Sequence, residues 1–383
     1  MSALPRVAKC GMPIGNTPVR VKRDSDGGAH MSGHETCSSV WSCPVCAASI
    51  RSHRADEITR GLAEHLRRPT RDERRSGRKK SGLPAQKGGA VLVTLTLPHQ
   101  AADALARTVE LVSEAFRFVQ RGRAYAGERD RYGILGHIRA FEVTHGEHGW
   151  HPHLHLILVT AARLTDEECR ELEAAWLARW NRFLAREGWP AASAAHGVRF
   201  DLVRRDSAAV AVYVTKLQEG ADKGKPARRS NVGNEVTRSD LKGGRRGSRV
   251  PFEILADFGS DGSAEDLALW HEYQLATKGR SAIRWSRGLR ALLLPDEDEL
   301  TDEAITDEAA DAETIAVITA PLYRAIAARP YGEAYLHVAA ERGGLDGIRR
   351  YVRALGLSPS GVHPPEAWEN FAEIDEYNQG REE

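Results

Sequence analysis

Three closely spaced histidines, His151, His153 and His155, are the residues of this chain best placed by type and spacing to do chemistry. They alternate with mostly apolar residues over 150–159, so in an extended strand the imidazoles share one face and the apolar side chains form a core face. Neutral imidazoles two residues apart on a strand can bind one metal ion together and leave coordination positions open. A half-buried strand with incidental surface histidines is the alternative when one His-x-His is taken alone.

Four of the five cysteines form a second group of possible ligands: Cys10, Cys37, Cys43 and Cys46. The last two make a Cys-x-x-Cys motif, and four thiolates suit a closed tetrahedral zinc site that holds together a segment too small to fold by burial. His30 and His34 compete with Cys10 for the fourth ligand position. A redox Cys-x-x-Cys is the other interpretation, but no thioredoxin-like pattern surrounds the motif. Cys169 stands alone in a helical pattern, where we expect a core residue.

Tyr213 and Lys216 are the remaining candidates for catalysis. Asp206 precedes a predicted helix over 208–219, on which these two side chains lie three residues apart and flank the apolar stripe. A tyrosine at the edge of a core ordinarily presents its hydroxyl to water. Beside a histidine-bound metal ion, the same hydroxyl could act as a nucleophile.

The elements that must position these residues follow the order βαββαβ. Apolar and β-branched runs predict strands over 90–97, 134–144, 150–160 and 197–204. Helical spacing over 105–123, and again after the capping box of Thr165 and Glu168, predicts the two intervening helices. This order is that of the ferredoxin-like split unit with an antiparallel sheet, so we expect an α+β fold.

The hairpin between the two middle strands adds Glu142 as a third candidate metal ligand. If the turn is symmetric about Glu147 and His148, Glu142 lies directly across the ladder from His153, within side-chain reach. A register slip of one residue would turn this carboxylate to the wrong face. A surface glutamate is the equally weighted alternative.

The formal net charge of +1 over 383 residues conceals a strong asymmetry. From Leu292 onward 7 Lys and Arg oppose 20 Asp and Glu, which leaves 47 against 33 for the preceding residues, a net charge of +14. A basic body predicts a polyanionic partner. The chain shows no long apolar run and no apolar signal segment, which predicts a soluble, cytoplasmic protein without a membrane partner. Cysteines in that compartment suit metal binding better than disulfides.

Three motifs, taken in order, resemble those of the HUH endonucleases, specifically the rolling-circle plasmid replication initiators of the actinobacterial type. They are an apolar strand with threonines (Val93-Thr94-Leu95-Thr96), a His-hydrophobe-His motif (His153-Leu154-His155) and a Tyr-x-x-Lys motif (Tyr213-Val214-Thr215-Lys216). The N-terminal cysteine cluster and the stretch 269–290 also look like this family. The resemblance therefore covers roughly residues 5–290.

The resemblance implies a site-specific endonuclease that nicks and rejoins plasmid origin DNA. A divalent ion, Mg²⁺ or Mn²⁺, held by His153 and His155 with Glu142 as a further ligand, would polarise the scissile phosphate of single-stranded DNA. Tyr213 would attack the phosphorus to give a 5′-phosphotyrosyl enzyme and a free 3′-OH, and Lys216 would help to ionise the tyrosine. The residues expected to contact the DNA are Thr94, Thr96, Arg204 and Arg205.

The implied partners are the plasmid origin, bound as double-stranded and cleaved as single-stranded DNA, and a host helicase and polymerase. One departure concerns the end of a replication round, because some initiators carry a glutamate one helical turn before the tyrosine, where this chain has Ala209. A mobilisation relaxase or a transposase with the same chemistry is the first alternative, although relaxases commonly carry the tyrosine ahead of the histidines. A zinc-dependent DNA-binding regulator without nuclease activity is the second.

With this resemblance the chain divides into seven predicted segments. They are a zinc-binding element (1–55), a basic helix and flexible linker (56–89), an HUH nuclease domain (90–257), a helical extension (258–294), an acidic linker (295–313), a small all-α domain (314–357) and a mobile tail (358–383). The basic run 222–249 either closes over DNA or forms a plain loop. Arg349, Arg350 and Arg353 favour a helix-turn-helix DNA reader, or, given the acidity of the region, a helical interaction bundle.

Overall fold

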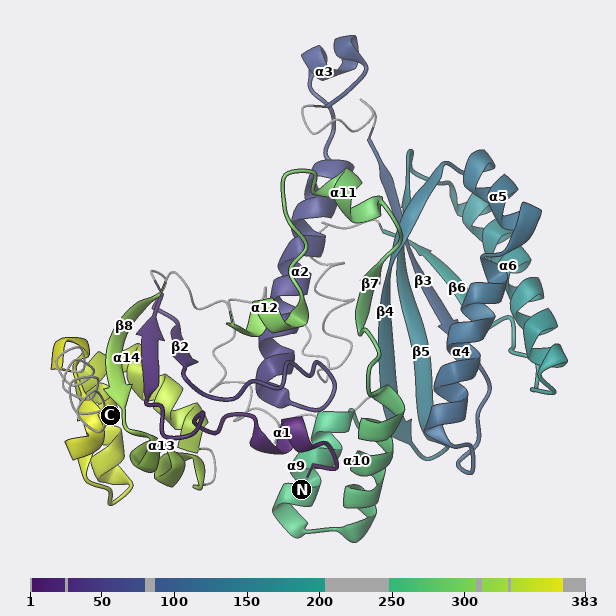
Figure 1. Ribbon diagram of the computed structural model, residues 1–383. Helices are drawn as coiled ribbons and strands as arrows, with labels where there is room; N and C mark the ends of the chain where they lie inside the picture. Colours follow the sequence, from purple (N-terminus) through teal and green to yellow (C-terminus); the bar gives the residue numbers. More distant parts are fainter. Residues whose placement is uncertain are drawn as a thin grey trace, which may run out of the picture. The chain divides into compact units, whose positions relative to one another are not determined.

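The computed structural model describes residues 2–24, 27–79, 87–203, 248–307, 312–329 and 332–367. The chain forms two compact units (Figure 1). The smaller contains the described parts of Met1–Ile50 and Leu300–Glu383, and the larger those of Arg51–Lys225 and Lys242–Glu299. Each unit combines helices with an antiparallel sheet, which confirms the α+β class.

The sheet of the larger unit has five strands in the order β6-β3-β5-β4-β7, and all neighbouring strands are antiparallel. The strands are β3 (Gly89–Thr96), β4 (Ile134–Gly146), β5 (Gly149–Thr160), β6 (Val198–Leu202) and β7 (Ile283–Trp285). The first four lie where the sequence predicts strands. The fifth corrects the prediction of a purely helical extension over 258–294, because β7 pairs with β4 and extends the sheet at its edge.

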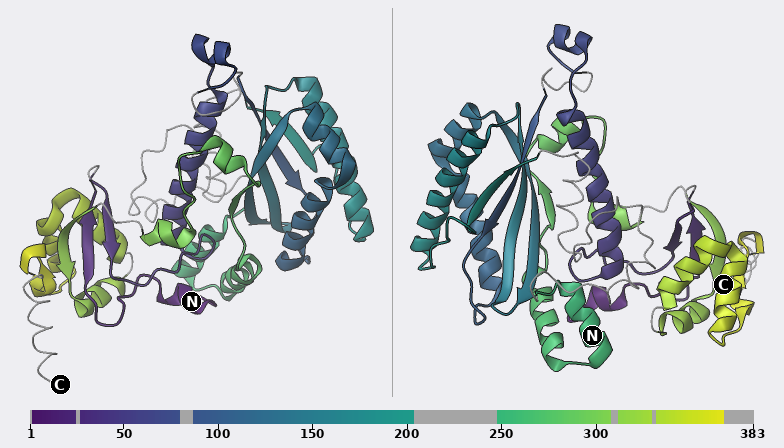
Figure 2. Two further views of the ribbon diagram at one scale, coloured as in Figure 1. Left: turned by 45° about the horizontal axis from the view of Figure 1, so that its top comes forward. Right: turned by 180° about the vertical axis from the view of Figure 1, so that it is seen from behind.

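Helices lie on both faces of this sheet (Figures 1 and 2). One face carries α4 (Leu105–Val119), α5 (Gly122–Arg131) and α6 (Asp166–Arg186), and the other carries α11 (Leu289–Leu293) and the C-terminal part of α2 (Pro44–Leu66). The unit also contains α3 (Arg71–Ser76), α9 (Pro251–Asp261) and α10 (Ala264–Thr277). α6 begins as predicted, because Thr165 accepts from the backbone N–H of Glu168 while the Glu168 carboxylate accepts from that of Thr165.

The two faces of the central strands differ in chemistry. On β3, Val91, Val93 and Leu95 are completely buried and alternate with Thr94 and Thr96, as period-2 patterning requires. On the side of α2 and α11 the sheet is apolar at one end only, where it contributes to a core that also contains residues of both helices: Ile58, Leu62, Ala90, Ile138, Ala140, Ile157, Val159, Leu289 and Leu293. The other end of this face carries the threonines and the histidine row. One end of the face is therefore packed in the core, and the other end carries the candidate site.

The smaller unit contains a four-stranded sheet in the order β2-β1-β8-β9. The strands are β1 (Val19–Arg23), β2 (Ala29–Ser32), β8 (Glu313–Ile318) and β9 (Val362–His363), and the helices are α1 (Pro5–Lys9), α12 (Asp302–Asp307), α13 (Ala320–Ala327) and α14 (Gly332–Ala354). The prediction of an all-α domain over 314–357 is therefore wrong. Thr314, Ile315 and Val317 are β-branched, a composition that favours a strand, and β8 finds its partner β1 about 300 residues earlier in the chain.

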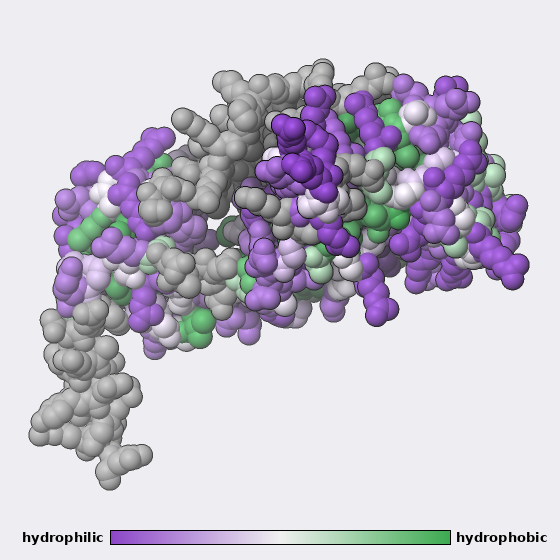
Figure 3. Space-filling model, turned by 90° about the horizontal axis from the view of Figure 1, so that it is seen from above, coloured by the Kyte–Doolittle hydropathy of each residue, from purple (hydrophilic) through white to green (hydrophobic). Residues whose placement is uncertain are grey.

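On the face drawn in Figure 3, hydrophilic side chains predominate among the coloured atoms and hydrophobic areas are scattered. Within the described ranges, no helix has the length and apolar character needed to span a bilayer.

Candidate functional site

The β4–β5 hairpin has the register that the sequence predicts. Glu142 pairs directly with His153, so the expected placement of a carboxylate beside the histidine row is confirmed. On the other side of β5, Thr96 pairs with His153 and Thr94 pairs with His155. Because directly opposite residues of an antiparallel pair point to the same face, three strands bring these five side chains together.

The carboxylate and the two imidazoles converge on one point. The Nε2 atoms of His153 and His155 both lie within hydrogen-bond distance of the same oxygen, Oε2 of Glu142, at 3.0 Å for His155. One ligand atom of each of the three residues lies within 4.8 Å of those of the other two, a grouping in which a single metal ion could be held. The three side chains belong to residues only 4–9% exposed. Two imidazole nitrogens and one carboxylate oxygen form a donor set that suits a divalent cation.

The remaining ring nitrogens of the two histidines have partners of their own. Nδ1 of His155 lies 3.1 Å from the hydroxyl of Thr94, and Nδ1 of His153 lies 3.2 Å from the backbone carbonyl of His151. Metal-binding histidines almost always donate the second ring N–H to such an acceptor, which fixes the tautomer and the orientation of the ring. The Nε2 atoms are thereby directed to the inside of the cluster.

The buried carboxylate is held as an anion. Burial alone would raise the pKa of Glu142, but the charge and hydrogen bonds of His153 and His155 outweigh it and lower this pKa to about 2. Burial lowers the pKa of His155, whereas for His153 the effect of burial is outweighed by Glu142, which raises its pKa. Glu142 therefore compensates positive charge at this point of the sheet, whether that charge is on an imidazole or on a cation.

A histidine that the sequence reasoning missed lies beside the row. His99, in the loop after β3, places Nε2 2.6 Å from Nδ1 of His151, and its own Nδ1 lies 2.9 Å from the carbonyl oxygen of His148. Burial, followed by the proximity of His153 and His99, lowers the pKa of His151 to about 3. His99 stands outside the two-residue spacing of the histidine row, so only the folded structure shows that it lies beside His151.

Glu272 of α10 anchors the N-terminal end of β5, the strand that carries the histidine row. Its carboxylate accepts hydrogen bonds from the backbone N–H of Leu105, at the start of α4, and from the indole of Trp150, at the start of β5, both at 2.8 Å. The ring of Trp150 also stacks on Tyr273, with the ring centroids 6.0 Å apart. The helix α10 thus holds together the strand with the histidines and the helix behind it.

The four N-terminal cysteines form a second convergent group. Sγ of Cys10 lies 3.5 Å from that of Cys43 and 3.6 Å from that of Cys46, and Sγ of Cys37 lies 3.8 Å from that of Cys46. Four sulfurs at about 2.3 Å from a central zinc ion in a tetrahedron are about 3.8 Å apart, so these separations fit a zinc site and exclude disulfides. Cys10 lies in the fourth position, for which His30 and His34 compete in the sequence. Neither histidine belongs to the group, and His30 instead pairs with Asp24.

The start of α2 supports negative charge at this cysteine group. Cys43 immediately precedes α2 and Cys46 lies in its first turn, where unpaired backbone N–H groups and the helix dipole favour thiolates. The Cys43 thiol donates to its neighbours, and these hydrogen bonds together with burial raise its pKa, whereas hydrogen bonds from the other three cysteines lower the pKa of Cys46. Cys169 lies elsewhere, buried on α6, which confirms its assignment as a core residue.

Several predicted site residues lie outside the described residues. These are Tyr213, Lys216, Arg204 and Arg205. Of the two threonines predicted to contact DNA, Thr94 has the contact with His155 given above, and the hydroxyl of Thr96 donates to the carbonyl of His196. Their role toward DNA stays a prediction.

Comparison with known proteins gave two relatives, both from Streptomyces. The chain is 32% identical over 355 residues to "Protein rep" of Streptomyces lividans, a match that covers 77% of this chain and 72% of that protein. It is 31% identical over 166 residues to "Neomycin resistance protein" of Streptomyces cyanogenus, a match that covers 37% of this chain and 34% of that protein. No family model matches the chain, and no solved structure matches it.

Proposed function

Because this chain belongs to the family of Protein rep of Streptomyces lividans, we propose that it is a plasmid replication initiator that nicks and rejoins origin DNA. The proposed enzyme class is the HUH endonuclease. The order β6-β3-β5-β4 around the histidine strand supports this assignment, because it is the strand order of a βαββαβ split unit with an antiparallel sheet.

The convergence of Glu142, His153 and His155 carries the proposal. Three side chains from two neighbouring strands direct one ligand atom each to a common point, and Thr94 and the His151 carbonyl support the rings from outside. A divalent ion bound there would act as a Lewis acid on a phosphoryl oxygen and would neutralise charge that develops on it. The sheet holds its ligands rigidly, as a preorganised site requires.

The nucleophile of the proposed reaction is Tyr213. Its phenolate attacks the phosphorus, the bond to the 3′ oxygen of the preceding nucleotide breaks, and that oxygen leaves as a free 3′-OH after taking up a proton. The phosphodiester energy is conserved in the resulting 5′-phosphotyrosine, so rejoining needs no ATP. At a pKa of about 10, only roughly one tyrosine in a thousand is ionised at pH 7, and full ionisation requires about 4 kcal/mol of stabilisation. Lys216, three residues further along the chain, would supply part of it.

Four tyrosines of the described ranges are less suited to act as the nucleophile. Burial, then the hydrogen bond to Glu171, raises the pKa of Tyr132 to about 12, and burial raises that of Tyr125. Burial likewise raises the pKa values of Tyr273 and Tyr323. A raised pKa leaves less phenolate at neutral pH, which is the opposite of what a nucleophile needs.

A plasmid nicking assay tests the proposal. Purified protein with supercoiled plasmid carrying the cognate origin and Mg²⁺ or Mn²⁺ should give open circles with protein attached. The double variant His153→Ala, His155→Ala should lose this activity, whereas His148→Ala, an exposed histidine in the turn of the same hairpin, should retain it. Nicking by the double variant at the rate of the wild type would refute the role of the cluster.

A further inference from the structure

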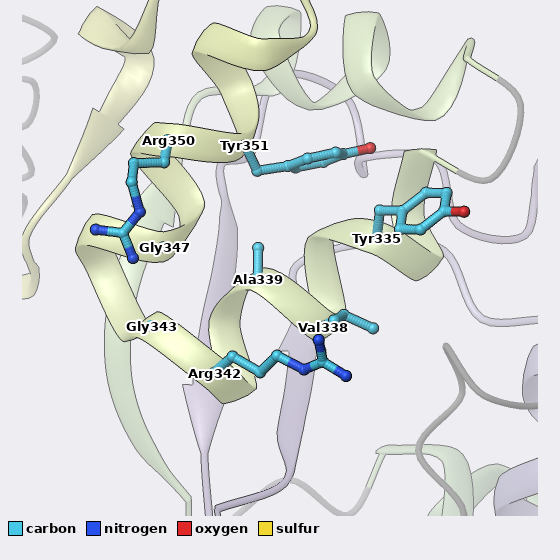
Figure 4. Close-up of a pocket in the computed structure, with 8 residues that line it drawn as sticks. All are labelled: Tyr335, Val338, Ala339, Arg342, Gly343, Gly347, Arg350 and Tyr351. Atoms are coloured by element: carbon cyan, nitrogen blue, oxygen red, sulfur yellow. The ribbon is translucent and has the colours of Figure 1, made fainter.

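A recess lies between the two halves of α14. The helix is interrupted at Gly344, where φ is 53° and ψ is −143°, so the chain turns and its second half returns beside the first. The recess has a volume of about 290 Å³ (Figure 4). Tyr335 and Tyr351 lie at one end, Arg350 at the other, and Arg342 along the side.

Two glycines line this recess at positions where a side chain would not fit. A Cβ atom on Gly347 would lie 2.2 Å from the carbonyl oxygen of Ala339, so the two halves of α14 approach each other there as closely as their backbones permit. A Cβ atom on Gly343 would lie 2.8 Å from Nη2 of Arg350. The guanidinium of Arg350 therefore lies over bare backbone, where its remaining N–H groups can meet a ligand.

The charge at the recess is positive, and neither of its arginines forms an ion pair within the described ranges. Over 314–363 the chain has six arginines and three acidic residues, so the strong acidity of the C-terminal region belongs to the flanking segments. Within the described ranges, neither Arg342 nor Arg350 forms an ion pair, and both are exposed. Guanidinium groups in this arrangement match phosphate, to which arginine donates two hydrogen bonds at once.

The aromatic end of the recess offers a ring surface. Tyr335 is 46% exposed, an unusual fraction for a large side chain in a packed helical pair. Its ring centroid lies 6.4 Å from that of Tyr351, whose hydroxyl donates to the carbonyl of Gly332 at 3.0 Å and so fixes the second ring. An exposed ring and two arginines around one recess form the combination that binds unpaired nucleotides.

We propose that this recess binds single-stranded DNA, with Arg342 and Arg350 on phosphates and Tyr335 stacked on a base. The site is concave, whereas reading a duplex requires an element that protrudes into the major groove, so a flexible single strand fits it better. The inference rests on the proposed function only for the choice of DNA as the nucleic acid. The site would hold the strand that nicking makes available, apart from the strand bound at Glu142, His153 and His155.

The test is binding of the full-length protein to a fluorescein-labelled oligothymidylate of about 20 nucleotides, which has no origin sequence. Arg350→Gln should weaken binding about five-fold or more and reduce the slope of log affinity against log salt by about 0.7. Tyr335→Ala should also weaken binding about five-fold or more, and Tyr335→Phe should not, because phenylalanine retains the stacking surface. Arg353→Gln is the matched control, since it removes the same charge from the same half-helix outside the recess.

Three outcomes would overturn the inference. The first is an equal loss of affinity in Arg350→Gln and Arg353→Gln, which would indicate general electrostatic attraction. The second is an equal loss of affinity of the recess variants for a duplex of the same length. The third is wild-type affinity in Tyr335→Ala. Arg342→Gln takes the place of Arg350→Gln if the latter unfolds. Nicking of saturating origin oligonucleotide should be unchanged in Arg350→Gln. A chain that never nicks but shows the Arg350→Gln effect would refute the proposed function and support this inference.

Discussion

Replacing Thr94 by valine is a precise perturbation of the Glu142, His153 and His155 cluster. The substitution keeps the branched shape of the side chain and removes the hydroxyl that lies 3.1 Å from Nδ1 of His155, a residue 4% exposed. When Nε2 of His155 binds a metal ion, Nδ1 carries the proton and must donate it. Thr94→Val removes this acceptor from the Nδ1–H of His155 in the metal-bound form.

The expected loss follows from the removal of that hydrogen bond. Hydrogen bonds to charged groups contribute about 1.5–3 kcal/mol, and each 1.4 kcal/mol corresponds to about ten-fold in affinity. The general effect of removing a partner of a metal-bound histidine is similar, at about 10–100-fold. We therefore expect Thr94→Val to bind Mn²⁺ about 10–100-fold more weakly while it retains its fold.

Calorimetric titration with Mn²⁺ measures this affinity directly, without dependence on activity. Thr96→Val is the matched control. Thr96 lies on the same strand as Thr94 and opposite His153, but its hydroxyl contacts the carbonyl of His196. Wild-type affinity in Thr94→Val, or an equal loss in both variants, would refute the proposed role of Thr94 in orienting His155.

Three further predictions concern other parts of the molecule. Cys43→Ser should lose the single tightly bound zinc ion, whereas Cys169→Ser should keep it, as measured by elemental analysis; full zinc content in Cys43→Ser would exclude the proposed ligand set. Burial raises the pKa of Glu333 from 4.5 to about 6, so the folded protein loses stability as the pH rises through this range. Glu333→Gln should therefore raise the free energy of unfolding by about 2 kcal/mol at pH 7.5 but not at pH 4. Urea denaturation at both pH values measures this, and an equal gain at both would contradict it. Arg284 on β7 lies directly opposite Arg139 on the neighbouring strand β4. Arg284→Glu should replace repulsion between the two side chains by attraction and raise the free energy of unfolding by about 0.5–1 kcal/mol at low salt. An unchanged or lower free energy of unfolding in urea denaturation would show that the two arginines do not repel each other.

Local patterns were enough to predict the central sheet and its candidate metal-ligand group. Alternating side chains locate β3 and β5, and a tight turn fixes which residues of a hairpin face each other, so Glu142 could be placed opposite His153 from the sequence. The four cysteines were likewise predictable as a set, because thiolates at these spacings satisfy one tetrahedral ion.

The elements that were not predicted depend on partners distant in the sequence. β8 pairs with β1, and β7 adds to the edge of β4, so neither short strand is defined by its own pattern. The position of His99 beside His151 and the contact of Thr94 with His155 arise from the folded sheet and have no signal in spacing. Tertiary pairing, which decides these cases, overrides local propensity.

The most direct test of the account is to locate the covalent DNA link. The protein is incubated with Mg²⁺ or Mn²⁺ and a single-stranded oligonucleotide from the cognate origin, digested, and its DNA-bearing peptide is sequenced by mass spectrometry. We predict a 5′-phosphodiester on Tyr213, absent from Tyr213→Phe and from the double variant His153→Ala, His155→Ala. A link on Tyr125 or Tyr132, or nicking without any protein–DNA link, would contradict it.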